Sequence, residues 1–152
     1  MNLAYRLVLL IALVGSMPAG AADTAPGVEY LNATHRLPQG VPFAEAVRVG
    51  SMLYLSGTIG ILPGKMQLVT GGIKEQAVQV MENIKAVLTA NQLGLKDLVR
   101  CTVLLADMGE WGSFNEVYKT YFTDHYPART AFAVNGLLLG ARVELECSAA
   151  YP

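Results

Sequence analysis

Apolar side chains between residues 73 and 93 recur at spacings of three and four, the period of an amphipathic α-helix. The positions that carry this pattern are Ile73, Ala77, Val80, Met81, Ile84, Val87 and Leu88. Such a helix has one apolar face, which must be buried against another element. The pattern therefore predicts a helix over residues 73–93, stopped by Gly94, with a sheet packed beside it.

Strand patterns lie on both sides of that helix. The expected strands are residues 44–49, 52–56, 98–106, 130–134 and 142–149, with a short one around 66–69. A second helix is expected over residues 111–125 and ends before Pro127, whereas residues 23–42 are rich in proline and glycine and read as irregular. The order predicts an α+β domain with a mainly antiparallel mixed sheet and two helices on one face.

The last strand shows which sheet face is buried. Residues 142–149 alternate polar and apolar side chains, as expected of a strand with one face in the core. By contrast, residues 52–56 are apolar on both faces, which indicates a second burial partner. A second copy of the same chain fits that role.

The N-terminus resembles a secretory signal peptide. Arg6 precedes an apolar run over residues 7–14, and small residues follow up to Ala22. The run is far shorter than the roughly 20 residues of a membrane-spanning helix, although an uncleaved anchor is the alternative. We expect a signal peptide over residues 1–22, cleaved after Ala21 or Ala22, and a domain over residues 23–152. The mature protein would then be exported, periplasmic or secreted, with no membrane attachment.

Charge and composition exclude several function classes. The chain has 152 residues with 11 Lys+Arg and 12 Asp+Glu, and the predicted mature part keeps 10 basic and 12 acidic residues. The basic residues are scattered, so we expect no nucleic acid partner. His35 and His125 lack the close ligand spacing of a metal site, and no metal or other cofactor is expected.

Cys101 and Cys147 lie in two different predicted strands. An oxidising compartment would allow a disulfide between them. Small buried thiols are the simpler interpretation, and we favour it, because free cysteine behaves as a small core residue.

The most informative segment is Pro127-Ala128-Arg129-Thr130, followed fifteen residues after the arginine by Glu144. A guanidinium at the start of an apolar strand needs an anionic partner. That partner could be Glu144 or Glu146 in a structural ion pair, or the carboxylate of a substrate. Sequence spacing leaves both interpretations open.

The same segments resemble the RidA/YjgF family of small imine deaminases, also labelled L-PSP proteins. The resemblance covers residues 28–151, and its motifs are Pro127-Ala-Arg-Thr130, Val143-Glu-Leu-Glu146, Leu55-Ser-Gly57, Asn115-Glu-Val-Tyr118 and the residue 76–88 helix pattern. It implies a chorismate-mutase-like fold and a homotrimer, with the sheets forming an inner barrel and three sites between subunits. It also implies hydrolysis of 2-imino acids to 2-oxo acids and ammonia, without a metal or cofactor.

The resemblance assigns roles to particular residues. Arg129 would bind the substrate carboxylate with help from the backbone at Ala131, and Glu144 would orient the attacking water. Asn115, Ser56, Gly57 and Phe43 would line the cleft. A positioned carboxylate near the water is sufficient for this chemistry, because a protonated imine is already electrophilic.

The chain also departs from the family pattern. Phe43 stands where an aromatic hydroxyl is frequent, Thr58 where glutamine is usual, and Ala131 where cysteine is common. A missing hydroxyl removes one hydrogen bond, worth about 0.5–1.5 kcal/mol. These departures leave the substrate open.

Two other functions are compatible with the residues. The first is a non-catalytic exported trimer that binds a small carboxylate in its intersubunit clefts. The second is a hydrolase triad of Ser56, Asp124 and His125, which the sequence supports weakly because Ser56 lacks a nucleophile-elbow motif.

Overall fold

The computed structural model describes residues 27–34, 37 and 40–152. The predicted signal peptide and His35 lie outside these residues. The elements, with η for 3-10 helices, are β1 (Val28–Leu31), β2 (Ala46–Val49), β3 (Met52–Leu55), β4 (Thr58–Ile59), α1 (Ile73–Ala90), η1 (Leu95–Asp97), β5 (Leu98–Leu105), η2 (Met108–Glu110), α2 (Trp111–Tyr118), η3 (Lys119–Tyr121), β6 (Ala128–Ala133), η4 (Leu138–Gly140) and β7 (Val143–Ala150).

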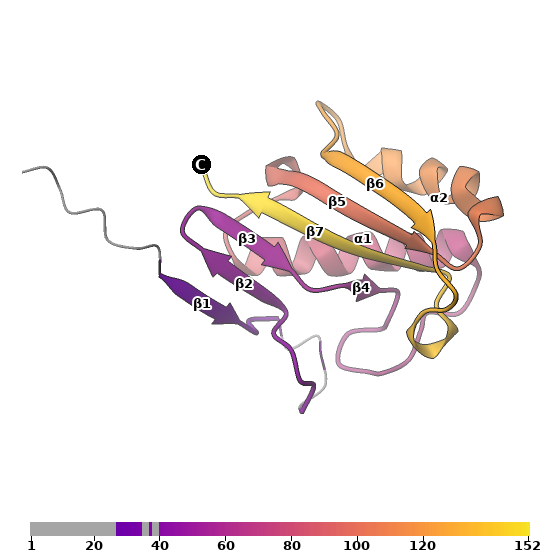
Figure 1. The fold of residues 1–152 in the computed structure, drawn as a ribbon, viewed down its shortest axis with the longest axis horizontal. Coiled ribbons are helices and arrows are strands. Elements are labelled where there is room, and N and C mark those ends of the chain that lie inside the picture. The colour runs from indigo at the N-terminus through magenta and orange to yellow at the C-terminus, as the bar shows by residue number, and fades with distance from the viewer. Residues whose placement is uncertain (1–26, 35–36, 38–39) are drawn as a thin grey trace, which may run out of the picture.

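The strands form one mixed sheet in the order β1-β2-β3-β7-β5-β6, and β4 also pairs with β7. The β5–β6 pair is parallel and the other pairs are antiparallel. Figure 1 shows α1 and α2 together on one face of this open sheet. The predicted α+β architecture with two helices on one face is confirmed. Among the described helices, none is long and apolar enough to cross a membrane.

The core lies between α1, α2 and the sheet. The predicted apolar face of α1 is buried there, with Ala77, Val80 and Ile84 fully enclosed. On β7, Val143 and Leu145 are buried, whereas Glu144 is half-buried and Glu146 is exposed, as the alternation predicts. The helical and strand periods thus identified the buried faces correctly.

Both helices end earlier than their apolar patterns predict. In α1 the amide of Asn91 donates to the carbonyl of Val87 at 2.8 Å, and Gln92 takes a positive φ of 61°. Leu93 then folds back, and its backbone N–H donates to the carbonyl of Leu88. After α2 the hydroxyl of Thr120 donates a hydrogen bond to the carbonyl of Val117 at 2.7 Å, where the chain tightens into η3. Polar side chains that bond to nearby carbonyls therefore decided both ends.

Three segments differ from expectation at the level of strands. One is Thr58–Ile59, which lies outside the expected strands and forms β4 against β7. The stretch over residues 23–42, expected to be irregular, contains β1, which pairs with β2. The strand expected around residues 66–69 is only an isolated bridge between Ile61 and Leu68. For β1 the partner strand supplies hydrogen bonds that local composition does not predict.

Cys101 and Cys147 form a disulfide, so the favoured interpretation of two free thiols was wrong. The two residues lie directly opposite one another on β5 and β7, and both are buried. Their pairing follows from strand register, which the sequence does not specify.

Candidate functional site

Arg129 lies on β6 with its guanidinium against the aromatic face of α2. Its central carbon is 4.5 Å from the ring centroid of Trp111, 4.6 Å from that of Tyr118 and 5.9 Å from that of Phe114. Aromatic faces attract a cation without neutralising its charge. No carboxylate pairs with Arg129 among residues 27–34, 37 and 40–152, so the structural ion pair with Glu144 or Glu146 is not formed.

A hollow of about 460 Å³ opens beside this guanidinium. Its lining residues are Asn115, Tyr118, Lys119, Tyr126, Pro127 and Arg129. Two of them are cationic and none is acidic, which favours an anionic ligand. Burial raises the pKa of Tyr118 to about 12, although the charge of Arg129 opposes this shift, so the phenol is neutral at physiological pH.

Strand register places Arg129 and Glu144 on opposite faces of the sheet. Arg129 lies beside Cys101, which in turn lies opposite Cys147, in the row that faces the helices. Glu144 alternates with the buried Leu145 on β7 and so points to the other face. The two side chains cannot meet within one subunit.

Glu144 lines a second hollow, of about 300 Å³, together with Ser56, Gly57 and Phe43. Gly57 leaves room for this carboxylate, because a Cβ at this position would overlap the Oε1 of Glu144 and push it aside. Burial raises the pKa of Glu144 above its ordinary value, and the negative charge of Glu146 raises it further. The carboxylate is therefore a better proton acceptor than an exposed glutamate.

Several polar groups near Glu144 are already engaged. The hydroxyl of Ser56 donates to the carbonyl of Ala44 at 2.7 Å. Thr58, one of the departures from the family pattern, is buried and its hydroxyl donates to the carbonyl of Ser56. Glu144 is thus the charged group that faces this hollow among its described lining residues.

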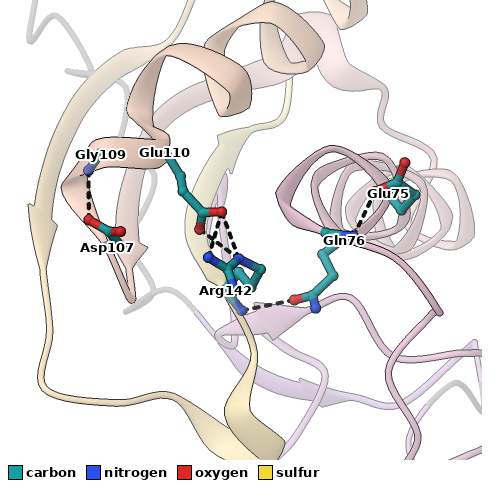
Figure 2. A network of polar contacts seen from close by, with 7 residues as sticks. Glu75, Gln76, Asp107, Gly109, Glu110 and Arg142 are labelled. Atoms are coloured by element: carbon teal, nitrogen blue, oxygen red, sulfur yellow. Dashed lines mark hydrogen bonds and ion pairs between the residues drawn. The ribbon is translucent and has the colours of Figure 1, made fainter.

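An ion pair links the elements that carry the two hollows. The Nε of Arg142 donates to both carboxylate oxygens of Glu110, each at 2.7 Å (Figure 2). The backbone N–H of Arg142 donates to the Oε1 of Gln76 at 2.9 Å. Glu110 precedes Trp111, which stacks on Arg129, and Arg142 lies two residues before Glu144. The ion pair therefore joins the start of α2 to the start of β7.

The residues predicted from sequence fall into two groups. Ser56, Gly57, Phe43 and Glu144 share one hollow, and Arg129 shares the other with Asn115. Ala131 is partly buried on β6 and lines neither of them. The sequence analysis did not predict that Trp111, Phe114 and Tyr118 surround Arg129, although all three lie within the helix expected over residues 111–125.

The triad alternative is not formed. Ser56 lines the hollow of Glu144, whereas Asp124 and His125 line a separate one, and His125 Nε2 lies 3.0 Å from the carbonyl of Lys96. The described residues also contain no group of three or more His, Cys, Asp or Glu side chains arranged to hold a metal.

Comparisons with known proteins agree with this architecture. The family model described as Endoribonuclease L-PSP matches residues 33–151. The 2-iminobutanoate/2-iminopropanoate deaminases of Mus musculus and Homo sapiens are 44% and 42% identical over 108 residues, which is 71% of this chain and 80% and 79% of theirs.

Solved structures show the same fold. A putative endoribonuclease from Thermotoga maritima superposes with a TM-score of 0.76 at 38% identity, covering 82% of this chain and 98% of that one. TdcF from E. coli with bound serine has a TM-score of 0.74 at 30% identity, covering 82% and 100%. With a family model that spans nearly the whole described chain and relatives above 40% identity, this protein belongs to the endoribonuclease L-PSP family, the RidA/YjgF proteins.

Proposed function

We propose that this protein hydrolyses the C=N bond of 2-imino acids and releases a 2-oxo acid and ammonia. Relatives that are 40–44% identical carry the name 2-iminobutanoate/2-iminopropanoate deaminase. The observation that carries the proposal is the uncompensated guanidinium of Arg129 at a hollow without acids. Such a group is suited to a substrate carboxylate, which it can bind through two parallel hydrogen bonds.

The complete site requires more than one subunit. RidA/YjgF proteins are trimeric, and the Arg129 and Glu144 hollows of this chain lie on opposite faces of the sheet. A homotrimer would bring the Arg129 hollow of one subunit against the Glu144 hollow of its neighbour. Native mass measurement tests this directly, and a monomer that hydrolyses imines would overturn it.

The reaction follows from these placements. Arg129 holds the substrate carboxylate, aided by the backbone at Ala131 and the side chain of Asn115, and leaves C2 facing Glu144. The carboxylate of Glu144 accepts a hydrogen bond from water and takes its proton as the oxygen attacks C2. That proton then passes from Glu144 to the nitrogen. The hydroxyl of the tetrahedral intermediate gives its own proton back to the carboxylate of Glu144, its oxygen forms the C=O bond, and the C–N bond breaks so that ammonia leaves with the 2-oxo acid.

The decisive experiment is turnover of freshly generated 2-iminobutanoate. An L-amino acid oxidase produces the imine from 2-aminobutanoate, and semicarbazide traps whatever the protein leaves unhydrolysed. We expect Arg129→Ala to abolish turnover and Glu144→Gln to slow it strongly. Arg100→Ala is the matched control, because Arg100 is an exposed arginine on the adjacent strand β5.

The same variants separate an enzyme from a binding protein. If the wild-type protein binds a small carboxylate without turnover, and binding survives Glu144→Gln but not Arg129→Ala, the protein is a non-catalytic trimer. That outcome would overturn the deaminase proposal and keep the role of Arg129.

We also propose that residues 1–22 direct export and are removed. Expression of the full chain should yield a periplasmic or secreted product that begins at residue 22 or 23. N-terminal sequencing of that product provides the test, and an intact Met1 on cytosolic protein would contradict it.

A further inference from the structure

The hollow beside Glu144 is walled by large apolar side chains from three separate segments. Ile59 and Ile61 are buried in its wall. Phe43, Met66 and Leu138 also line it and remain 47%, 45% and 58% exposed. Large apolar side chains that gather around one hollow and stay exposed are typical of a ligand-binding surface.

Several polar groups behind this wall are already hydrogen-bonded within the chain. The buried amide of Asn83 donates to the carbonyls of Ile59 and Ile61, at 3.2 and 2.9 Å. The hydroxyl of Ser56 is engaged with the carbonyl of Ala44. Apart from Glu144, the described lining therefore favours an apolar group.

We infer that this hollow receives the side chain of the substrate and selects 2-imino acids with branched aliphatic or aromatic side chains. The inference rests on the proposed function, which places C2 of the substrate near Glu144. The side chain attached to C2 then lies against Phe43, Met66 and Leu138. A methyl group would leave most of the roughly 300 Å³ unfilled.

The expected selectivity follows from the burial of extra carbons. Each buried methylene raises kcat/KM about 4-fold, so the three further carbons of the leucine-derived imine predict a kcat/KM up to roughly 60-fold above that of 2-iminopropanoate. The phenylalanine-derived imine should also exceed 2-iminopropanoate. This preference differs from the small substrates named for the deaminase relatives.

The test compares kcat/KM for imines generated by an amino acid oxidase from alanine, leucine and phenylalanine. Met66→Ser and Leu138→Ser should each reduce the leucine-to-alanine ratio at least threefold. Leu139→Ser is the matched control, because Leu139 is a neighbouring leucine that is 47% exposed and does not line the hollow. It should leave the ratio unchanged.

The outcomes separate the inference from the proposed function. Equal kcat/KM for the three imines, or an equal effect of Leu139→Ser and Leu138→Ser, would overturn the inferred preference for large side chains. The proposed deaminase activity would still stand. Absence of turnover with every imine would overturn the deaminase instead. Calorimetric binding of 4-methyl-2-oxopentanoate and pyruvate then tests the side-chain preference of the hollow without turnover. Tighter binding of the larger acid supports the inference, and equal or weaker binding overturns it.

Discussion

The guanidinium of Arg129 lies 4.5 Å from the ring of Trp111, and residue 110, immediately before that tryptophan, is paired with Arg142 at the start of β7. The cation that would bind substrate is therefore positioned by an aromatic ring rather than by an acid.

Trp111→Leu removes the largest ring beneath Arg129 and should weaken substrate binding. A cation–π contact contributes about 0.5–2 kcal/mol, so KM should rise roughly 2- to 30-fold while kcat changes less. Steady-state kinetics with 2-iminobutanoate measure both parameters. Trp111→Phe keeps an aromatic face and is the control, and an equal rise in KM for both variants would contradict the role of the ring.

Gly57→Ala should reduce kcat, because the added Cβ overlaps the carboxylate of Glu144 and must displace it. Gly27→Ala is the matched control, since a Cβ at Gly27 meets no atom within 4 Å. Thermal unfolding of both variants separates a displaced carboxylate from a damaged fold. Full activity of Gly57→Ala would show that Glu144 does not need its present position.

Tyr118→Phe should stabilise the protein. The hydroxyl of Tyr118 is buried without a hydrogen-bond partner among the described residues, and an unsatisfied buried hydroxyl costs about 1–3 kcal/mol. Its removal keeps the ring beneath Arg129 and should raise the free energy of unfolding by about 1 kcal/mol in urea titrations. A loss of stability would show that the hydroxyl has a partner in solution.

Glu146→Gln should shift the acidic limb of the kcat/KM profile to lower pH. Burial and the charge of Glu146 both raise the pKa of Glu144, and in the proposed mechanism the deprotonated form of Glu144 accepts a proton from water. Removing the neighbouring charge lowers that pKa. The control is Glu116→Gln, which removes an exposed carboxylate on α2, and an identical shift in that variant would contradict the explanation.

The same raised pKa has a consequence for folding. Because the folded-state pKa of Glu144 lies above its unfolded value, its favourable contribution to stability is complete below the ordinary carboxyl pKa. That contribution is lost as the pH rises through the raised pKa. Glu144→Gln should therefore flatten the pH dependence of the unfolding free energy in this window.

Reduction of the Cys101–Cys147 disulfide should lower stability. The bond joins residues 46 positions apart, and closing a loop of this size contributes about 2–4 kcal/mol through the unfolded state. Guanidinium unfolding with and without reductant measures the difference, and a Cys101→Ala/Cys147→Ala variant, which should not respond to reductant, is the control. Coincident curves for the wild-type protein would show that the thiols are free.

Local patterns in the sequence were sufficient for much of the fold. The helical period of residues 73–93 and the alternation over residues 142–149 identified the faces of α1 and β7 that are buried. Both patterns arise from backbone geometry within a few residues, so they can be read without knowledge of distant partners. The ends of α1 and α2 depend on single polar side chains, so the sequence predicted these ends less accurately.

The sequence by itself determined the helices, most strands, the family and the two residues, Arg129 and Glu144, on which the proposed chemistry depends. Only the tertiary structure decided that β5 lies between β6 and β7, which puts these two residues on opposite faces and joins Cys101 to Cys147. The physical reason is that strand order and register are set by contacts between segments far apart in the chain, and a one-residue change of register would reverse every side chain of a strand.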